Sequence, residues 1–242
     1  MDQQVQELAQ YLVDRLQQAP PNTRIIVGIA GIPASGKSTL AAQIVARTNT
    51  SLETTSPVTG GPKAVLVGLD GWHLTRAQLD AFADPVEAHA RRGAHWTFDG
   101  QAYVSFVTAL RSPISDCTVT SSEEATQVIK APSFDHAVKD PVADDIIIRH
   151  SDRIVVIEGL YTFLSFDPWC VAGKLLDERW VIDIDPAEAT KRLVARHIQS
   201  GITCNLEEAT RRAEENDMPN GRFLLENLIQ PTQWIQSVSN SA

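Results

Sequence analysis

Residues 24–45 read RIIVGIAGIPASGKSTLAAQIV, and this stretch decides the fold class. Its first part, residues 24–30, is a short apolar run rich in β-branched side chains, which predicts a buried parallel strand. Residues 31–38 then match the pattern Gly-x-x-x-x-Gly-Lys-Ser, and a helix is expected from residue 38 to residue 45. A strand, a glycine-rich turn and a helix in this order predict a phosphate-binding loop.

The chemistry of such a loop explains the residue types in it. Backbone N–H groups of the tight turn and the positive end of the helix can together surround a phosphate group. The Lys37 amine can reach the β- and γ-phosphates of a nucleotide, and the Ser38 hydroxyl can bind Mg²⁺. We therefore expect ATP and Mg²⁺ as cofactors, and the loop residues expected to bind them are Gly31, Ile32, Pro33, Ala34, Ser35, Gly36, Lys37, Ser38 and Thr39.

Two acidic residues follow apolar runs that predict further strands. Asp70 comes after the run at 64–67, and Glu158 comes directly after the run at 154–157. The carboxyl ends of parallel strands form the edge of an open α/β sheet where ligands bind. Asp70 is our candidate general base for a substrate hydroxyl, with an N-cap of the following helix as the alternative. Glu158 could hold Mg²⁺ directly or through water, or contact the substrate.

A phosphate-binding loop does not by itself distinguish a kinase from an NTPase. The chain has no Asn-Lys-x-Asp run for guanine recognition and no Asp-x-x-Gly at a strand end, which argues against a GTPase switch. A strand-end carboxylate that can accept a hydroxyl proton favours phosphoryl transfer to a hydroxyl. The alternative is a regulatory ATPase that hydrolyses ATP without an acceptor.

Composition and charge limit the partners. The 242 residues carry 21 Lys+Arg and 30 Asp+Glu, a formal net charge of −9, which argues against a nucleic-acid or anionic-membrane partner. The longest apolar runs are far shorter than the ~20 residues that cross a bilayer, and the N-terminus is too polar for a signal peptide. Three widely spaced cysteines predict neither a disulfide framework nor a paired-thiolate metal site. We expect a cytoplasmic protein whose partners are ATP and a small-molecule acceptor.

The remaining patterns predict strands that alternate with helices. We expect an opening helix over 5–16, a flexible loop over 49–62, helices over 186–200 and from 205, and strands at 64–67, 128–129, 145–148, 153–157, 180–184 and 233–238. A short polar connection at 150–152 is compatible with an antiparallel hairpin of the strands on either side of it. Together these elements predict one α/β domain over 1–242, with a mostly parallel sheet flanked by helices.

Several motifs occur in an order that resembles a known family. The segments are GIPASGKST, LDGWH, RRGAHWTFD, PSFDH, VVIEGLY and KRLVARHIQSG, in that order along the chain. They resemble the P-loop kinases grouped with uridine kinase, phosphoribulokinase and bacterial pantothenate kinase, and most of all a sugar- or nucleoside-kinase-like branch. This resemblance implies a P-loop fold with a helical lid over about 191–222 and ATP-dependent phosphorylation of a nucleoside, sugar or pantothenate-like hydroxyl.

The resemblance also implies roles for individual residues. Asp70 matches the catalytic aspartate, and Glu158 matches the acid after the Walker B strand. Arg192 and Arg196 fall where the lid of such kinases supplies arginines to the phosphates, so with Lys37 they complete the expected catalytic set. The residues expected to bind substrate are Asp70, His73, Arg92, Asp99, Phe134, Asp135 and His136.

Ordinary structural roles compete with these assignments. Asp99, Asp135 and His136 lie in predicted loops, where turn and cap roles are common. A histidine such as His73 is as often a satisfied structural group as a substrate contact. Arg192 and Arg196 share one helix face and could close over phosphate charge, but a surface salt bridge to Glu188 is the rival interpretation of that face.

Overall fold

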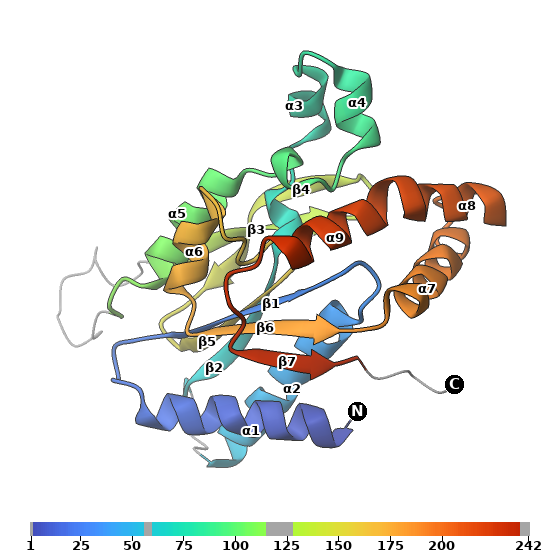
Figure 1. Ribbon diagram of the computed structural model, residues 1–242. Helices are drawn as coiled ribbons and strands as arrows, with labels where there is room; N and C mark the ends of the chain where they lie inside the picture. Colours follow the sequence, from blue (N-terminus) through green and yellow to red (C-terminus); the bar gives the residue numbers. More distant parts are fainter. Residues whose placement is uncertain (1, 56–59, 115–127, 238–242) are drawn as a thin grey trace.

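The central feature of the computed structural model is a five-stranded parallel sheet (Figure 1). The structure describes residues 2–55, 60–114 and 128–237. Its sheet has the strand order β2-β5-β1-β6-β7, with β1 at Ile25–Gly31, β2 at Lys63–Gly68, β5 at Asp152–Glu158, β6 at Glu178–Asp183 and β7 at Gln233–Gln236. All four pairings are parallel, as the apolar strand runs predict.

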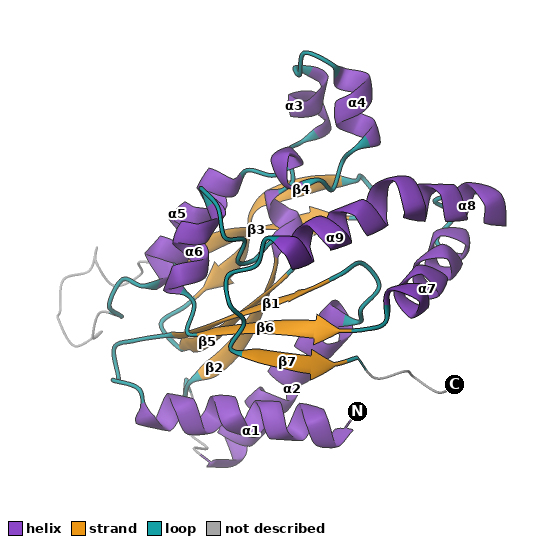
Figure 2. Ribbon diagram, viewed as in Figure 1, coloured by secondary structure: helices purple, strands orange, loops and turns teal. Residues whose placement is uncertain are grey.

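Helices cover both faces of this sheet (Figure 2). Strand β1 is buried along its whole length. Its alternate residues serve two cores: Ile25, Val27 and Ile29 belong to the core under α1 (Asp2–Gln18) and α2 (Lys37–Thr55), whereas Ile26 and Ala30 belong to the core under α5 (Gly100–Leu110) and α6 (Trp169–Leu175). Because side chains alternate across a strand, a run that is apolar at every position needs both faces covered.

A smaller cap lies beside the carboxyl ends of the strands. It contains η1 (Leu69–Trp72), α3 (Arg76–Asp80), α4 (Pro85–Ala90), η2 (His95–Thr97) and the antiparallel pair β3 (Ile129–Asp135) and β4 (Asp140–Ile148). Figure 1 shows α3 and α4 projecting away from the sheet. A second helical segment runs from α7 (Pro186–Gln199) through α8 (Leu206–Arg212) and η3 (Ala213–Asp217), a π-helix, into α9 (Met218–Glu226). The region predicted as a lid falls on this segment.

The helix starts follow the predicted capping chemistry. The Asp185 side chain accepts hydrogen bonds from the N–H groups of Ala187 and Glu188 at the start of α7. Asn205 accepts one from Glu208 at the start of α8. Such caps satisfy backbone donors that a helix leaves unpaired at its first turn. No helix in the described ranges is long and apolar enough to cross a membrane.

Two sequence predictions about the sheet need correction. The predicted hairpin of 145–148 with 153–157 is wrong, because β4 pairs with β3 while β5 lies between β1 and β2. The reason is burial: residues 154–157 are all buried, whereas β4 is mostly exposed. The strand predicted near 128–129 begins at Ile129 and continues to Asp135, so Phe134 and Asp135 end a strand rather than lie in a loop.

The predicted loop over 49–62 is also wrong in its first half. Helix α2 continues to Thr55, and the part of the loop at 56–59 lies outside the described residues. Leu52 is buried against the core, and the hydroxyls of Thr50, Thr54 and Thr55 donate to carbonyls one turn back. The hydroxyls are thus satisfied within the helix, and burial of Leu52 offsets the low helix propensity of Ser and Thr.

Candidate active site

The phosphate-binding loop connects β1 to α2. Ala34 and Gly36 have positive φ angles of 61° and 90°, a region in which glycine is favoured. Gly31 is needed for a different reason, because a Cβ atom there would lie 2.6 Å from the Ser35 hydroxyl. Lys37 and Ser38 begin a helix of 19 residues, so backbone N–H groups and the helix dipole are available at the loop. This geometry suits an anionic phosphate chain.

Three charged residues from different elements converge on the loop. The Ser38 hydroxyl donates to Oε1 of Glu158 at 3.0 Å, which joins the start of α2 to the end of β5. Burial lowers the pKa of the Lys37 amine, and the charges of Glu158 and Asp70 oppose that shift. Burial likewise raises the pKa of Glu158, and the Lys37 charge opposes it. The amine and the two carboxylates are therefore close enough to influence one another.

The same residues fit a divalent cation that arrives with a nucleotide. Oε2 of Glu158 is buried and has no hydrogen-bond partner among the described residues. A carboxylate and a hydroxyl are hard oxygen donors of the kind that Mg²⁺ prefers. Within the described ranges, no three His, Cys, Asp or Glu side chains cluster as metal ligands. A cation held by Ser38 and Glu158 would therefore take its remaining ligands from phosphate and water.

Asp70 lies in η1, the short helix that follows β2. The N-cap of this helix is Gly68 and has no side-chain cap hydrogen bond, so Asp70 does not serve as the cap. The Asp70 side chain is 53% exposed, and Oδ1 lies 3.8 Å from Nδ1 of His73. An exposed carboxylate with so little engagement inside the protein is available to a ligand.

His73 connects Asp70 to an aromatic wall. Its Nδ1 lies 2.8 Å from the backbone carbonyl of Asp70, and since a carbonyl only accepts, Nδ1 carries the proton. Burial lowers the pKa of His73, which favours the neutral ring and leaves Nε2 as an acceptor. The ring centroid lies 3.9 Å from that of Phe98 and 5.2 Å from that of Phe134, which in turn lies 5.2 Å from the His136 ring.

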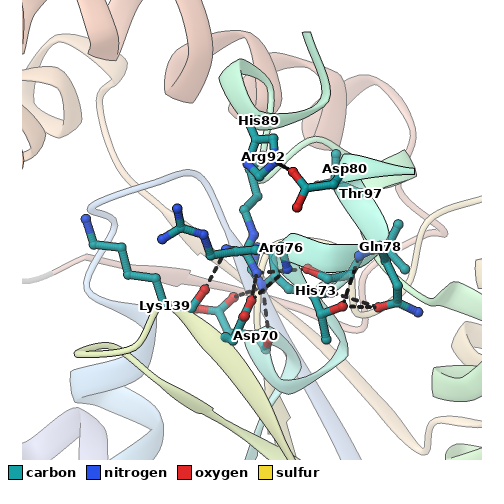
Figure 3. A network of polar contacts seen from close by, with 12 residues as sticks. Asp70, His73, Arg76, Gln78, Asp80, His89, Arg92, Thr97 and Lys139 are labelled. Carbon is teal, nitrogen blue, oxygen red and sulfur yellow. Dashed lines mark hydrogen bonds and ion pairs between the residues drawn. The ribbon is translucent and has the colours of Figure 1, made fainter. Parts of the chain in front are cut away.

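Within the cap, Arg92 holds the β3–β4 turn against the segment between η1 and α3 (Figure 3). Its Nη2 donates to the Leu74 carbonyl and to Oδ1 of Asp140, both at 2.8 Å, and its Nη1 donates to the Lys139 carbonyl. Asp140 also accepts from the Arg76 backbone N–H at 2.9 Å. The Arg92 guanidinium carbon lies 5.7 Å from the centre of the Phe134 ring. Both Nη atoms are thus used within the protein.

We expect Arg92→Gln to lower the free energy of unfolding by about 1.5–3 kcal/mol, because it removes hydrogen bonds from a charged donor at a side chain that is 16% exposed. The urea midpoints of the variant and the wild type measure this difference. Arg76→Gln is the matched control, since Arg76 contributes its backbone to Asp140 and keeps that contact. A wild-type urea midpoint for Arg92→Gln would contradict the stabilising role of the Arg92 hydrogen bonds.

Asp99 and Asp135 have local structural roles. Asp99 caps α5 by accepting from the Ala102 N–H. It also lines a cavity of about 440 Å³ beside Trp96 and Asp167. Asp135 accepts from the N–H groups of Ala137 and Val138, which closes the turn between β3 and β4. These contacts match the turn and cap alternative, and in the described part of the chain they use Oδ1 of each residue.

The two arginines of α7 differ in their surroundings. Arg192 Nε donates to Glu188 at 3.0 Å, as the salt-bridge alternative expected, and Nη1 donates to the Ser237 hydroxyl at 3.1 Å. Ser237 in turn donates to the Ser35 carbonyl at 2.8 Å, so the residue that follows β7 is tied to the phosphate-binding loop. Arg196 is exposed, and its charge acts on the Lys37 amine. Sequence patterns carried no signal for the Ser237 contact.

Comparisons with known proteins agree with this architecture. No family model matches the sequence. The chain is 36% identical over 215 residues to "Putative uridine kinase C227.14" of Schizosaccharomyces pombe, which covers 89% of this chain and 84% of that protein. It is 42% identical over 167 residues to "ATP-dependent kinase-like protein notR'" of Aspergillus versicolor, covering 69% of this chain and 92% of that protein.

A solved structure is similar over nearly the whole chain. A "putative fructose transport system kinase" from Silicibacter sp. TM1040 superposes with a TM-score of 0.77 at 26% identity, covering 95% of this chain and 98% of that one. The relatives share kinase names, and the sheet order and phosphate-binding loop described above are those of a P-loop fold. The chain therefore belongs to the P-loop kinases that include uridine kinase-like proteins.

Proposed function

We propose that this kinase transfers the γ-phosphoryl group of ATP to a hydroxyl of a small metabolite such as a nucleoside, a sugar or a pantothenate-like compound. The observation that carries the proposal is the exposed Asp70 carboxylate. Its charge opposes the lowering of the Lys37 pKa by burial, so it lies near the amine of the phosphate-binding loop. A general base in this place can accept the hydroxyl proton while the Lys37 amine interacts with the oxygens of the transferred phosphoryl group.

In the proposed step, residues of this chain accept the proton and stabilise the negative charge of the phosphates. The acceptor oxygen forms a bond to the γ-phosphorus as the bond to the bridging oxygen of ADP breaks, and the acceptor proton goes to Asp70. Lys37 and the backbone N–H groups of the loop residues other than Pro33 stabilise the phosphate oxygens. Ser38 and Glu158 would hold a Mg²⁺ ion that arrives with ATP, and the ion would supply positive charge beside the phosphates. His73 orients the acceptor through its free Nε2.

We also propose that residues 1–242 act as one kinase domain with a lid over 191–222. Arg196 supports this proposal, because its side chain is exposed and its charge helps to lower the pKa of the Lys37 amine. Closure of a lid would exclude water and bring Arg196 to the transferring phosphate. In this conformation Arg192 is held by Glu188 and Ser237, and closure would have to exchange those contacts for phosphate.

The names of relatives point to hydroxylated acceptors. One is named as a uridine kinase and one as a fructose transport kinase, and both uridine and fructose carry several hydroxyl groups. These names support a hydroxylated acceptor.

The direct test is ADP release from ATP and Mg²⁺ with a panel of nucleosides, pantothenate, sugars and sugar phosphates. We expect at least one acceptor to raise ADP release about tenfold or more over the acceptor-free rate, because an oriented hydroxyl replaces unoriented water. Mass spectrometry of the product should show one added phosphoryl group. A response that is flat over the panel, with steady acceptor-free hydrolysis, would instead favour the regulatory ATPase.

A further inference from the structure

A cavity of about 440 Å³ lies beside the starts of α5 and α6, two helices that pack against each other (Figure 1). Four aromatic side chains line it, namely Trp96, Phe98, Phe166 and Trp169. Phe98 and Trp169 are buried, whereas Trp96 is exposed at the surface. The volume lies within the range of roughly 300–1,000 Å³ that is typical of small-molecule sites. The cavity can therefore hold the apolar body of a small organic ligand.

Close packing fixes the aromatic walls of this cavity. A Cβ atom on Gly100 would lie 3.0 Å from Cγ of Pro168 and 3.1 Å from the Trp169 ring, so α5 begins directly against the segment that carries Trp169. The Phe98 ring lies 3.9 Å from the His73 ring and 6.1 Å from the Trp169 ring, measured between centroids. Phe98 and Trp169 both belong to the main hydrophobic core. A ligand would thus meet a pre-formed aromatic surface.

The charged side chains that line the cavity have one sign. Asp99 and Asp167 line it and are exposed, and no Lys or Arg is found among its described lining residues. Oδ1 of Asp99 accepts from the Ala102 N–H at 2.9 Å, and Oδ1 of Asp167 lies 2.9 Å from Sγ of Cys170. None of the ion pairs within the described ranges involves either carboxylate. No basic side chain in that part of the chain neutralises these two negative charges.

His95 is the third titratable group at the cavity, and it adds no positive charge at neutral pH. Burial lowers its pKa, and the ordinary pKa of a histidine, about 6.5, is already below neutrality. Its ring stacks on Phe223 of α9, with 4.4 Å between centroids and 5° between planes, and meets Phe166 edge-on at 5.4 Å. His95 therefore acts as a further aromatic wall.

We propose that this cavity binds a small organic cation, in which an ammonium group is attached to an apolar body. The carboxylates of Asp99 and Asp167 attract the positive charge, and the face of an aromatic ring such as Trp96 attracts it as well. The apolar body packs on the aromatic walls. An anion is repelled by the same groups, and a neutral ligand gains only the packing. This inference goes beyond the proposed phosphoryl transfer and does not depend on it.

The test compares cations with uncharged molecules of the same shape. Ligand-observed NMR titration of the wild type, without ATP, uses two pairs of probes: phenethylamine with phenethyl alcohol, and choline with its carbon analogue neopentyl carbinol. We expect the cation of at least one pair to bind about tenfold more tightly than its neutral partner, because only the cation gains the electrostatic attraction.

Two variants and two matched controls locate the binding site. Asp167→Asn keeps the side-chain shape and an oxygen for the Cys170 thiol, and the preference for the cation should fall below about threefold. Asp145→Asn removes the same charge from an exposed position on β4 and should keep the wild-type preference. Trp96→Ala should weaken binding of the cation about threefold or more, whereas Trp234→Ala, at an exposed tryptophan of β7, should not.

The controls separate a built site from general attraction to an acidic protein of net charge −9. Equal loss of preference in Asp145→Asn and Asp167→Asn would show such general attraction and overturn the proposal. So would equal binding of each cation and its neutral partner, or dissociation constants above about 10 mM for both cations. Circular dichroism reports folding. Trp96→Ala changes an exposed side chain and covers the case in which Asp167→Asn fails to fold, and wild-type binding by the folded variants would also overturn the proposal.

Discussion

Asp70→Asn is expected to lower turnover by roughly 10²–10⁴-fold while ATP affinity and stability stay near wild type. The asparagine keeps the shape of the side chain but cannot accept the hydroxyl proton. Because Asp70 is half-exposed and does not cap η1, its carboxylate carries little of the fold. Steady-state kinetics with the identified acceptor measures turnover, and nucleotide titration measures ATP affinity.

The control for this prediction is Asp80→Asn in the same cap. Asp80 is exposed, its Oδ1 lies 2.7 Å from Nε2 of His89, and it belongs to α3, which projects away from the sheet (Figure 1). We expect it to leave turnover within about twofold, since exposed pairs contribute little. A folded Asp70→Asn variant with full activity would remove Asp70 from the mechanism, and Glu158 would be the next acid to test.

Lys37→Ala is expected to weaken ATP binding roughly 10- to 150-fold at fixed Mg²⁺, which corresponds to about 1.5–3 kcal/mol of charge-assisted contacts. Burial already lowers the pKa of this amine, so the fold gains little from its charge. We therefore expect the thermal midpoint to stay unchanged or rise, which separates a binding defect from unfolding. Isothermal titration with a non-hydrolysable analogue gives the affinity.

Lys63→Ala serves as the comparison, because Lys63 is an exposed lysine at the start of β2, the opposite end from the ligand edge. It should bind the nucleotide as the wild type does. Equal affinities for Lys37→Ala and the wild type would defeat the assignment of residues 31–39 as the nucleotide loop. Loss of turnover with unchanged affinity would place Lys37 in catalysis alone.

The sequence by itself determined the features that depend on neighbours along the chain. The strand, turn and helix over 24–45 formed as predicted, because a β-branched run, a glycine with positive φ at Gly36 and a helix start are all local preferences. The caps at Asp185 and Asn205 were predictable for the same reason. Strand-end placement of Glu158 also followed from an apolar run with an acid at its end.

Only the tertiary structure decided which distant segments meet. Strand β5 lies in the middle of the sheet rather than in the predicted hairpin, because its apolar run at 154–157 must be covered on both faces. Strand β4 pairs instead with β3, whose sequence has little periodic hydrophobic pattern. The Arg92 clamp on Asp140 and the Ser237 bond to Ser35 join residues 48 and 202 positions apart. Polar side chains form such hydrogen bonds with the groups that lie near them in the folded protein. Which groups lie near them depends on how the apolar residues elsewhere in the chain are buried.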